Sequence, residues 1–65
     1  MWIVVGMANS KKMANSMQMA LESEGILVKI SNISSKTKRN SDTYEVLVLE
    51  SESDSAREIL LEKGL

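Results

Sequence analysis

The pattern of apolar and polar positions predicts three β-strands. Residues 2–7 read WIVVGM, a continuous apolar run that is typical of a strand covered on both faces or central in a sheet. Residues 26–32 and 43–50 alternate with period two instead. Their alternate apolar positions are Ile26, Val28, Ile30, Tyr44, Val46 and Val48. We expect these two strands to bury this face and to form a hairpin.

The segment from residue 8 to residue 25 has the spacing of an amphipathic helix. Its apolar face comprises Met13, Ala14, Met17, Ala20 and Leu21. Met19 lies off this face and is expected to be exposed, whereas Met13 and Met17 are expected in the core. Ser10 suits the N-cap, and Gly25 suits a left-handed C-cap.

A second helix is predicted within residues 51–65. Serine and acidic residues open this segment, and they favour a helix start through side-chain capping and through the macrodipole. The shared apolar face comprises Ala56, Ile59 and Leu60. Lys63 and Gly64 are expected to end the helix.

The order strand, helix, strand, strand, helix predicts one α+β domain over residues 1–65. Two helices on one face of a small sheet give a ferredoxin-like βαββα two-layer sandwich with a three-stranded, mainly antiparallel sheet. In this arrangement the third strand lies between the other two. A fourth strand would cover the outer edge of the first strand, so we expect that edge to be open.

Composition narrows the possible partners. The chain has 8 basic and 9 acidic residues and a formal charge of -1, so no global field recruits nucleic acid or an anionic membrane. The apolar run at the start is far shorter than the roughly 20 residues that span a bilayer. The absence of cysteine suits a reducing cytosol, and we expect a cytoplasmic protein.

Composition also argues against catalysis. The chain has neither histidine nor cysteine, and it therefore lacks the commonest general base, the thiolate nucleophile and the usual zinc ligands. Glu50, Glu52 and Asp54 could offer oxygens to a hard cation, but no glycine turn or closing glutamate accompanies them. We expect neither an enzyme nor a bound metal or cofactor.

Basic residues mark one candidate site for an anion. Lys11 and Lys12 follow Ser10 where a strand gives way to a helix, and exposed amides at such a position can hold an anion. Lys36, Lys38 and Arg39 lie in the predicted hairpin loop. These three residues belong either to a solvated loop without a binding role or to a binding site for a small anionic ligand or an acidic protein. Nucleic acid is disfavoured because Trp2 and Tyr44 are the only aromatic residues.

A candidate interface is apolar. If the alternate positions of the two hairpin strands face the helices, then Leu27, Leu47 and Leu49 point to the other side of the sheet. The first strand adds Trp2 and Val4 to this side. Such a patch usually marks an interface, so we expect self-association through this sheet face, through the edge of the first strand, or through both. The alternative is that the terminal KGL or the hairpin loop folds back over the patch.

The segments ANSKKMANSMQMALESEGILVKI, YEVLV and AREIL together resemble a family of small prokaryotic domains described as signal-transducing. The resemblance covers nearly the whole chain, and it implies the strand-helix-strand-strand-helix fold, a bacterial cytoplasmic setting, and binding or regulation without a catalytic residue. We therefore expect a non-catalytic regulatory module acting as a homodimer. The alternative is a sensor of a small anionic or phosphorylated ligand.

Overall fold

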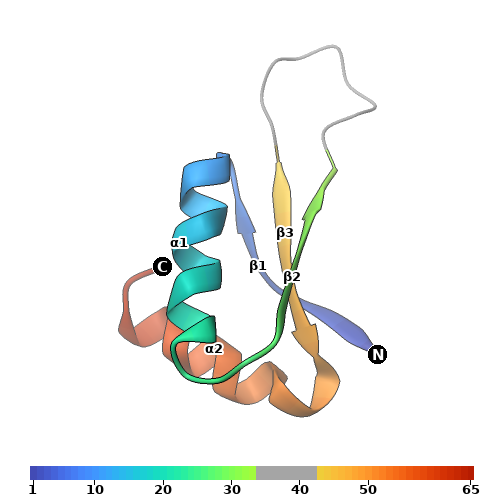
Figure 1. Cartoon of the computed structure of the whole chain (residues 1–65), viewed down its shortest axis with the longest axis vertical. Helices are drawn as coiled ribbons and strands as arrows, with labels where there is room; N and C mark the ends of the chain where they lie inside the picture. Colours follow the sequence, from blue (N-terminus) through green and yellow to red (C-terminus); the bar gives the residue numbers. More distant parts are fainter. Residues whose placement is uncertain (34–42) are drawn as a thin grey trace.

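The computed structural model describes residues 1–33 and 43–65 and has one antiparallel sheet with both helices on the same side (Figure 1). The elements are β1 (Trp2–Ala8), α1 (Lys11–Glu22), β2 (Val28–Asn32), β3 (Tyr44–Leu49), the short 3₁₀ helix η1 (Glu50–Glu52) and α2 (Ser53–Glu62). The strand order is β1-β3-β2. This confirms the predicted βαββα sandwich with the third strand in the middle.

The strand β1 lies at an edge of the sheet. It pairs with β3 on one side, and β3 pairs with β2 on its other side. The prediction that residues 2–7 are covered on both faces or central is therefore wrong. Among the strands of the described residues, only β3 has two partners. The face of β1 that points away from the helices exposes Trp2, Val4 and Met7.

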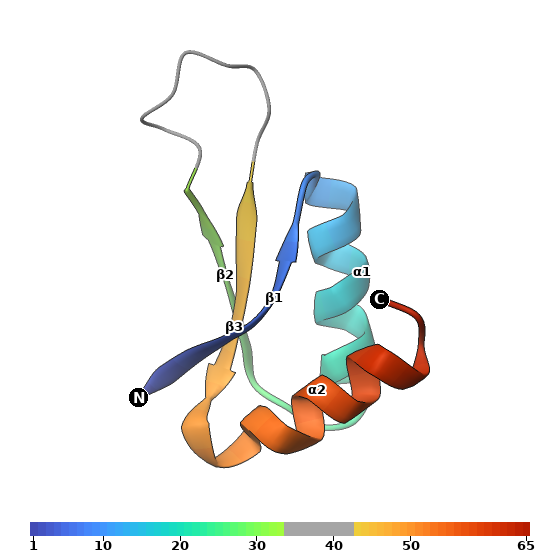
Figure 2. The same cartoon turned by 180° about the vertical axis from the view of Figure 1, so that it is seen from behind.

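A β-bulge interrupts β1 at Val5. Val4 pairs with Leu47 and Gly6 pairs with Val46, so Val5 is one residue more than the ladder needs. The strand changes direction near its middle, as both views show (Figures 1 and 2). Val5 packs against the core, and the next residue, Gly6, faces the same way.

Gly6 leaves room for both helices to approach the sheet. A Cβ atom at this position would collide with the Cε atom of Met17 and would lie 3.5 Å from the Cδ1 atom of Leu60. Met17 comes from α1 and Leu60 from α2. The glycine is therefore explained by packing between the layers, since its missing side chain is replaced by the ends of two others.

The core lies between the sheet and the helices. Its buried side chains are Ala8, Ala14, Met17, Leu21, Ile26, Tyr44, Val46, Val48, Ala56 and Leu60. The predicted apolar faces of all four segments are thus confirmed in outline. One correction is needed: Met13 is 36% exposed and does not belong to the core, because it lies in the first turn of α1, before the buried positions of this helix begin at Ala14. Met19 is exposed, as predicted.

Both helices end in the same hydrogen-bonded motif. The N–H of Ile26 donates to the carbonyl of Leu21, and the N–H of Gly25 donates to the carbonyl of Glu22, with Gly25 at a φ of 83°. These are the two bonds of a Schellman motif, and the buried Leu21 and Ile26 supply its apolar contact. In α2, Leu65 bonds to Leu60 in the same way.

Replacement of Gly25 by alanine is expected to destabilise the fold by about 1–2 kcal/mol, because an L side chain is strained at positive φ. Thermal unfolding followed by circular dichroism should show a melting temperature lower by about 4–8 °C for each kcal/mol. Asparagine tolerates this conformation, so Gly25→Asn should lose less stability than Gly25→Ala. An alanine variant as stable as the wild type would contradict the assignment.

Candidate functional site

The face of the sheet opposite the helices is the main candidate for a functional surface. We call it the open face, and it follows the outward positions of the strands and their extensions. Its residues are Trp2, Val4, Met7, Leu27, Lys29, Ser31, Ile33, Thr43, Glu45, Leu47 and Leu49. The backbone bond from the N–H of Ile33 to the carbonyl of Thr43, at 2.9 Å, continues the pairing beyond the strands.

The open face is apolar and accessible. Its exposed fractions are 36% for Trp2, 38% for Val4, 50% for Met7, 62% for Leu27 and 43% for Ile33. Leu47 and Leu49 are half-buried. The structure thus places the five residues of the predicted interface, Trp2, Val4, Leu27, Leu47 and Leu49, on one side of the sheet. Neither α1 nor α2 lies on that side (Figures 1 and 2).

The pairing of the strands arranges the open face in rows. One row joins Val4, Leu47 and Lys29, because Leu47 pairs with the other two. The next row joins Met7, Glu45 and Ser31. Trp2 pairs with Leu49 in a third row, and Leu27 extends this row by alternation. Ile33 and Thr43 form a fourth row at the opposite end. An apolar row therefore lies at one end, and the two charged residues lie in the middle rows.

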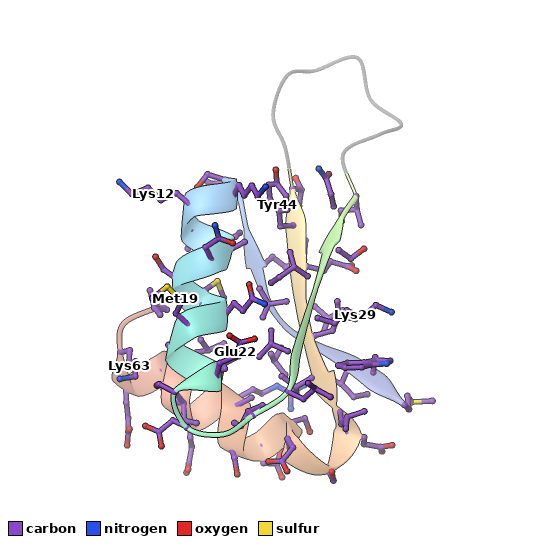
Figure 3. The ribbon with its side chains drawn as sticks, viewed as in Figure 1. Lys12, Met19, Glu22, Lys29, Tyr44 and Lys63 are labelled. Carbon is purple, nitrogen blue, oxygen red and sulfur yellow. The ribbon has the colours of Figure 1, made fainter. Side chains whose placement is uncertain are left out.

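Lys29 is the cation of the open face. Its side chain projects from β2 on the side away from the helices (Figure 3), and its Nζ atom lies 5.5 Å from the centre of the Trp2 ring. A cation over an indole ring is attracted to the electron-rich face of the ring. The contact joins the two edges of the sheet, since Trp2 belongs to β1.

The C-terminal residues do not cover the open face. The N–H of Leu65 donates to the carbonyl of Leu60, which holds the end of the chain against the helix layer. Figure 2 shows the C-terminus beside α1, whereas the N-terminus lies on the far side of the sheet. The prediction that KGL could fold over the leucines is therefore wrong. The other covering segment that we considered, residues 34–42, lies outside the described residues.

A shallow depression borders the open face. It is lined by Met1, Leu49, Glu50 and Ser51 and is largely open to solvent. The N–H of Glu50 donates to the carbonyl of Met1 at 2.9 Å, which joins two of the lining residues. A pocket that orients a small molecule usually encloses most of its surface, and this depression does not.

The predicted anion site is only partly described. The hydroxyl of Ser10 accepts a hydrogen bond from the N–H of Met13 at 3.1 Å, which confirms the N-cap of α1. Lys11 and Lys12 are exposed in the first turn, where no acidic residue accompanies them, and Lys12 extends outward (Figure 3). The other three predicted contacts, Lys36, Lys38 and Arg39, lie outside the described residues.

Acidic residues gather around the start of α2. Glu50 and Glu52 lie in η1, and Asp54 lies 3.8 Å from Arg57 in the first turn of α2. In residues 1–33 and 43–65, no three His, Cys, Asp or Glu side chains are arranged to hold a metal ion. No helix in these same ranges is long and apolar enough to cross a bilayer.

Six members of the open face were not among the predicted interface residues: Met7, Lys29, Ser31, Ile33, Thr43 and Glu45. Lys29 and Glu45 were visible from the alternation of their strands, but their places beside the leucines depend on the register. Ile33 continues the same alternation beyond the predicted strand. Met7 had no signal in the sequence, because the bulge at Val5 reverses the alternation.

The open face therefore unites the predicted interface residues, whereas the predicted anion contacts are described only in part. The case for a function depends on the geometry of this face. No family model, no curated protein and no solved structure matches the chain.

Proposed function

We propose that the protein is a non-catalytic binding or regulatory module of the cytoplasm that acts as a homodimer joined through its open faces. One observation carries the proposal: seven apolar side chains cover a sheet face that neither helix shelters (Trp2, Val4, Met7, Leu27, Ile33, Leu47 and Leu49). Apolar patches of this kind mark interaction sites on soluble proteins. The resemblance to a signal-transducing family agrees with a regulatory role and remains a prediction.

The charges of the open face favour a second copy of the chain as the partner. The face carries one cation, Lys29, and one carboxylate, Glu45. A balanced surface attracts neither a strongly acidic nor a strongly basic partner. It can complement itself, because a two-fold axis presents each charge to the other copy. Trp2 and Met7 add residue types that are enriched in interfaces.

The face is a better candidate for this contact than the outer edge of β1. Addition of a strand at an edge requires a regular row of backbone N–H and C=O groups. The bulge at Val5 breaks that row and bends the strand. The open face, by contrast, keeps a regular register across β3 and β2.

The size of the open face sets the expected affinity. A standard interface covers about 800 Å² on each partner. Three strands spaced about 4.8 Å apart, and rising about 3.3 Å per residue, span only about 14 Å by 20 Å. Because this contact is small, we expect a weak dimer with a Kd between about 1 and 100 µM.

Sedimentation equilibrium over a range of about 1–500 µM should show a reversible monomer–dimer equilibrium. Trp2 is the only tryptophan, so its fluorescence gives an independent reading of the same transition. Its emission should shift to shorter wavelength as the dimer forms, since dimerisation removes water from the indole ring. A chain that stays monomeric across the range, with unchanged Trp2 emission, would contradict the proposal.

The alternative function, sensing a small anionic or phosphorylated ligand, remains a prediction. It depends on Lys11 and Lys12, and on basic residues outside the described ranges. Two exposed lysines at the positive end of a helix are mutually repelling, and a bound anion would relieve this repulsion. The described residues offer no further anion contact beside them, so the open face carries the stronger argument.

A further inference from the structure

The order of the rows on the open face restricts how two copies can meet. Paired sheets in a sandwich lie about 10 Å apart with their strands within about 30° of each other. A two-fold axis between such sheets can run along the strands or across them. The two choices bring different rows into contact, and the charges distinguish them.

An axis along the central strand β3 would place each residue of β3 opposite the same residue of the second copy. Glu45 would then face Glu45 of the second copy, because β3 is the middle strand of both sheets. Lys29 would lie over Val4, since β2 would cover β1 of the second copy. Like charges that face each other in an interface are strongly unfavourable. This arrangement is therefore disfavoured.

An axis across the strands inverts the order of the rows. If the axis passes between the Leu47 row and the Glu45 row, the Leu47 row of each copy covers the Glu45 row of the other. Glu45 then lies over Leu47 of the second copy, one strand away from its Lys29. A lysine side chain spans the spacing of about 4.8 Å between neighbouring strands. Glu45 of each copy therefore lies within reach of Lys29 of the other copy, and two such ion pairs form in each dimer.

We infer that the two copies pack about a two-fold axis across the strands, with Lys29 of each copy paired to Glu45 of the other. This inference rests on the proposed homodimer and specifies its register. The same axis places the end row that contains Leu27 over the opposite end row of the second copy, which contains Ile33. Both side chains are exposed in the single chain, so apolar residues meet at the two ends while the charges pair between them.

Charge reversal tests this register. Lys29→Glu alone places two glutamates at each contact, and Glu45→Lys alone places two lysines there. Each single variant should raise the Kd at least about tenfold, because like charges then meet twice in the dimer. In an equimolar mixture, a Lys29→Glu chain can pair with a Glu45→Lys chain. The two substituted side chains then carry opposite charges and face each other, and the unchanged Glu45 of the first chain faces the unchanged Lys29 of the second. The mixture should dimerise with a Kd within about threefold of the wild type.

The mixture shows whether a raised Kd comes from lost pairing between two copies or from a lost contact within one chain. Lys29→Glu also removes the contact of Lys29 with Trp2, but a loss inside the chain is not repaired by a second variant. Matched reversals on the helix layer, Lys63→Glu and Glu58→Lys, should leave the Kd unchanged. Sedimentation equilibrium measures all of these variants, and circular dichroism checks that each one is folded.

The outcomes distinguish the register from the dimer itself. The inference is supported if each single variant dimerises with a raised Kd and the mixture dimerises with a Kd close to that of the wild type. If the wild type dimerises but the Kd of the mixture is as high as that of each single variant, the inferred register is wrong, whereas the proposed homodimer is still supported. A monomeric wild type would overturn both proposals.

Discussion

Replacement of Leu21 by alanine is expected to destabilise the protein by about 2–5 kcal/mol, the usual range for a leucine removed from a core. Leu21 is fully buried among the core side chains, and it supplies the apolar contact of the cap that ends α1. A core in a chain of this size rarely supplies more than about 3–5 kcal/mol in total. The variant should therefore be largely unfolded at room temperature, which urea titration and far-UV circular dichroism would measure.

Leu61 provides the matched control, because Leu61→Ala deletes the same atoms from a side chain that is 82% exposed. Its effect should be within about 0.5 kcal/mol of zero. If the two alanine variants lost stability equally, the assignment of the core to the layer between helices and sheet would be wrong.

Replacement of Leu47 by glutamate is expected to abolish the proposed dimer while the monomer stays folded. Leu47 lies on the central strand of the open face, between Val4 and Lys29. A charge in the middle of the contact should cost about 2 kcal/mol or more in each copy, which is about 30-fold in Kd per copy. The free energy of unfolding should change less, because Leu47 is only half-buried and the new carboxylate lies across from Lys29.

The control for this variant is Leu61→Glu, which adds the same charge on the exposed side of α2. Sedimentation equilibrium should give a wild-type Kd for Leu61→Glu and a monomer for Leu47→Glu. A Leu47→Glu variant that still dimerised with the wild-type Kd would exclude the open face as the interface.

Local chemistry made much of the fold predictable. The period-two alternation at Val46 and Val48 identified the buried side of β3, and both residues are fully buried. Ser10 and Gly25 mark the ends of α1 because each satisfies backbone groups that the helix leaves unpaired. These features depend on neighbours within about one helical turn or one strand, so a single sequence contains them.

The failures have a different physical origin. A uniformly apolar strand gives no alternation, so residues 2–7 could not reveal which of their side chains face the helices. The bulge at Val5 adds a second difficulty, because it inserts one residue into the strand. Even-numbered positions point away from the helices before the bulge, and odd-numbered positions do so after it. Met7 is exposed for that reason. Met13 has the spacing of the buried face, but it lies in the first turn of α1, and the buried positions of this helix begin only at Ala14.

The candidate site was predictable in part for the same reasons. The positions of the leucines on the open face were predicted from the alternation of their strands. Their exposure was predicted because two helices cover only one side of a sheet. The relation between Lys29 and Glu45 did not follow, because it depends on the register of β2 against β3. Register is a property of paired strands and is invisible in either strand alone.

The surplus residue in β1 also bears on how far assembly can proceed. This strand contains no charged residue and no proline, the usual safeguards against unlimited stacking of sheets side by side. The kink at Val5 is the safeguard that its sequence does provide. The bulge breaks the regular row of backbone N–H and C=O groups on the outer edge of β1, and it therefore disfavours the addition of further strands there. If two copies associate through their open faces as proposed, assembly at this edge would then stop at a closed pair instead of growing into a fibre.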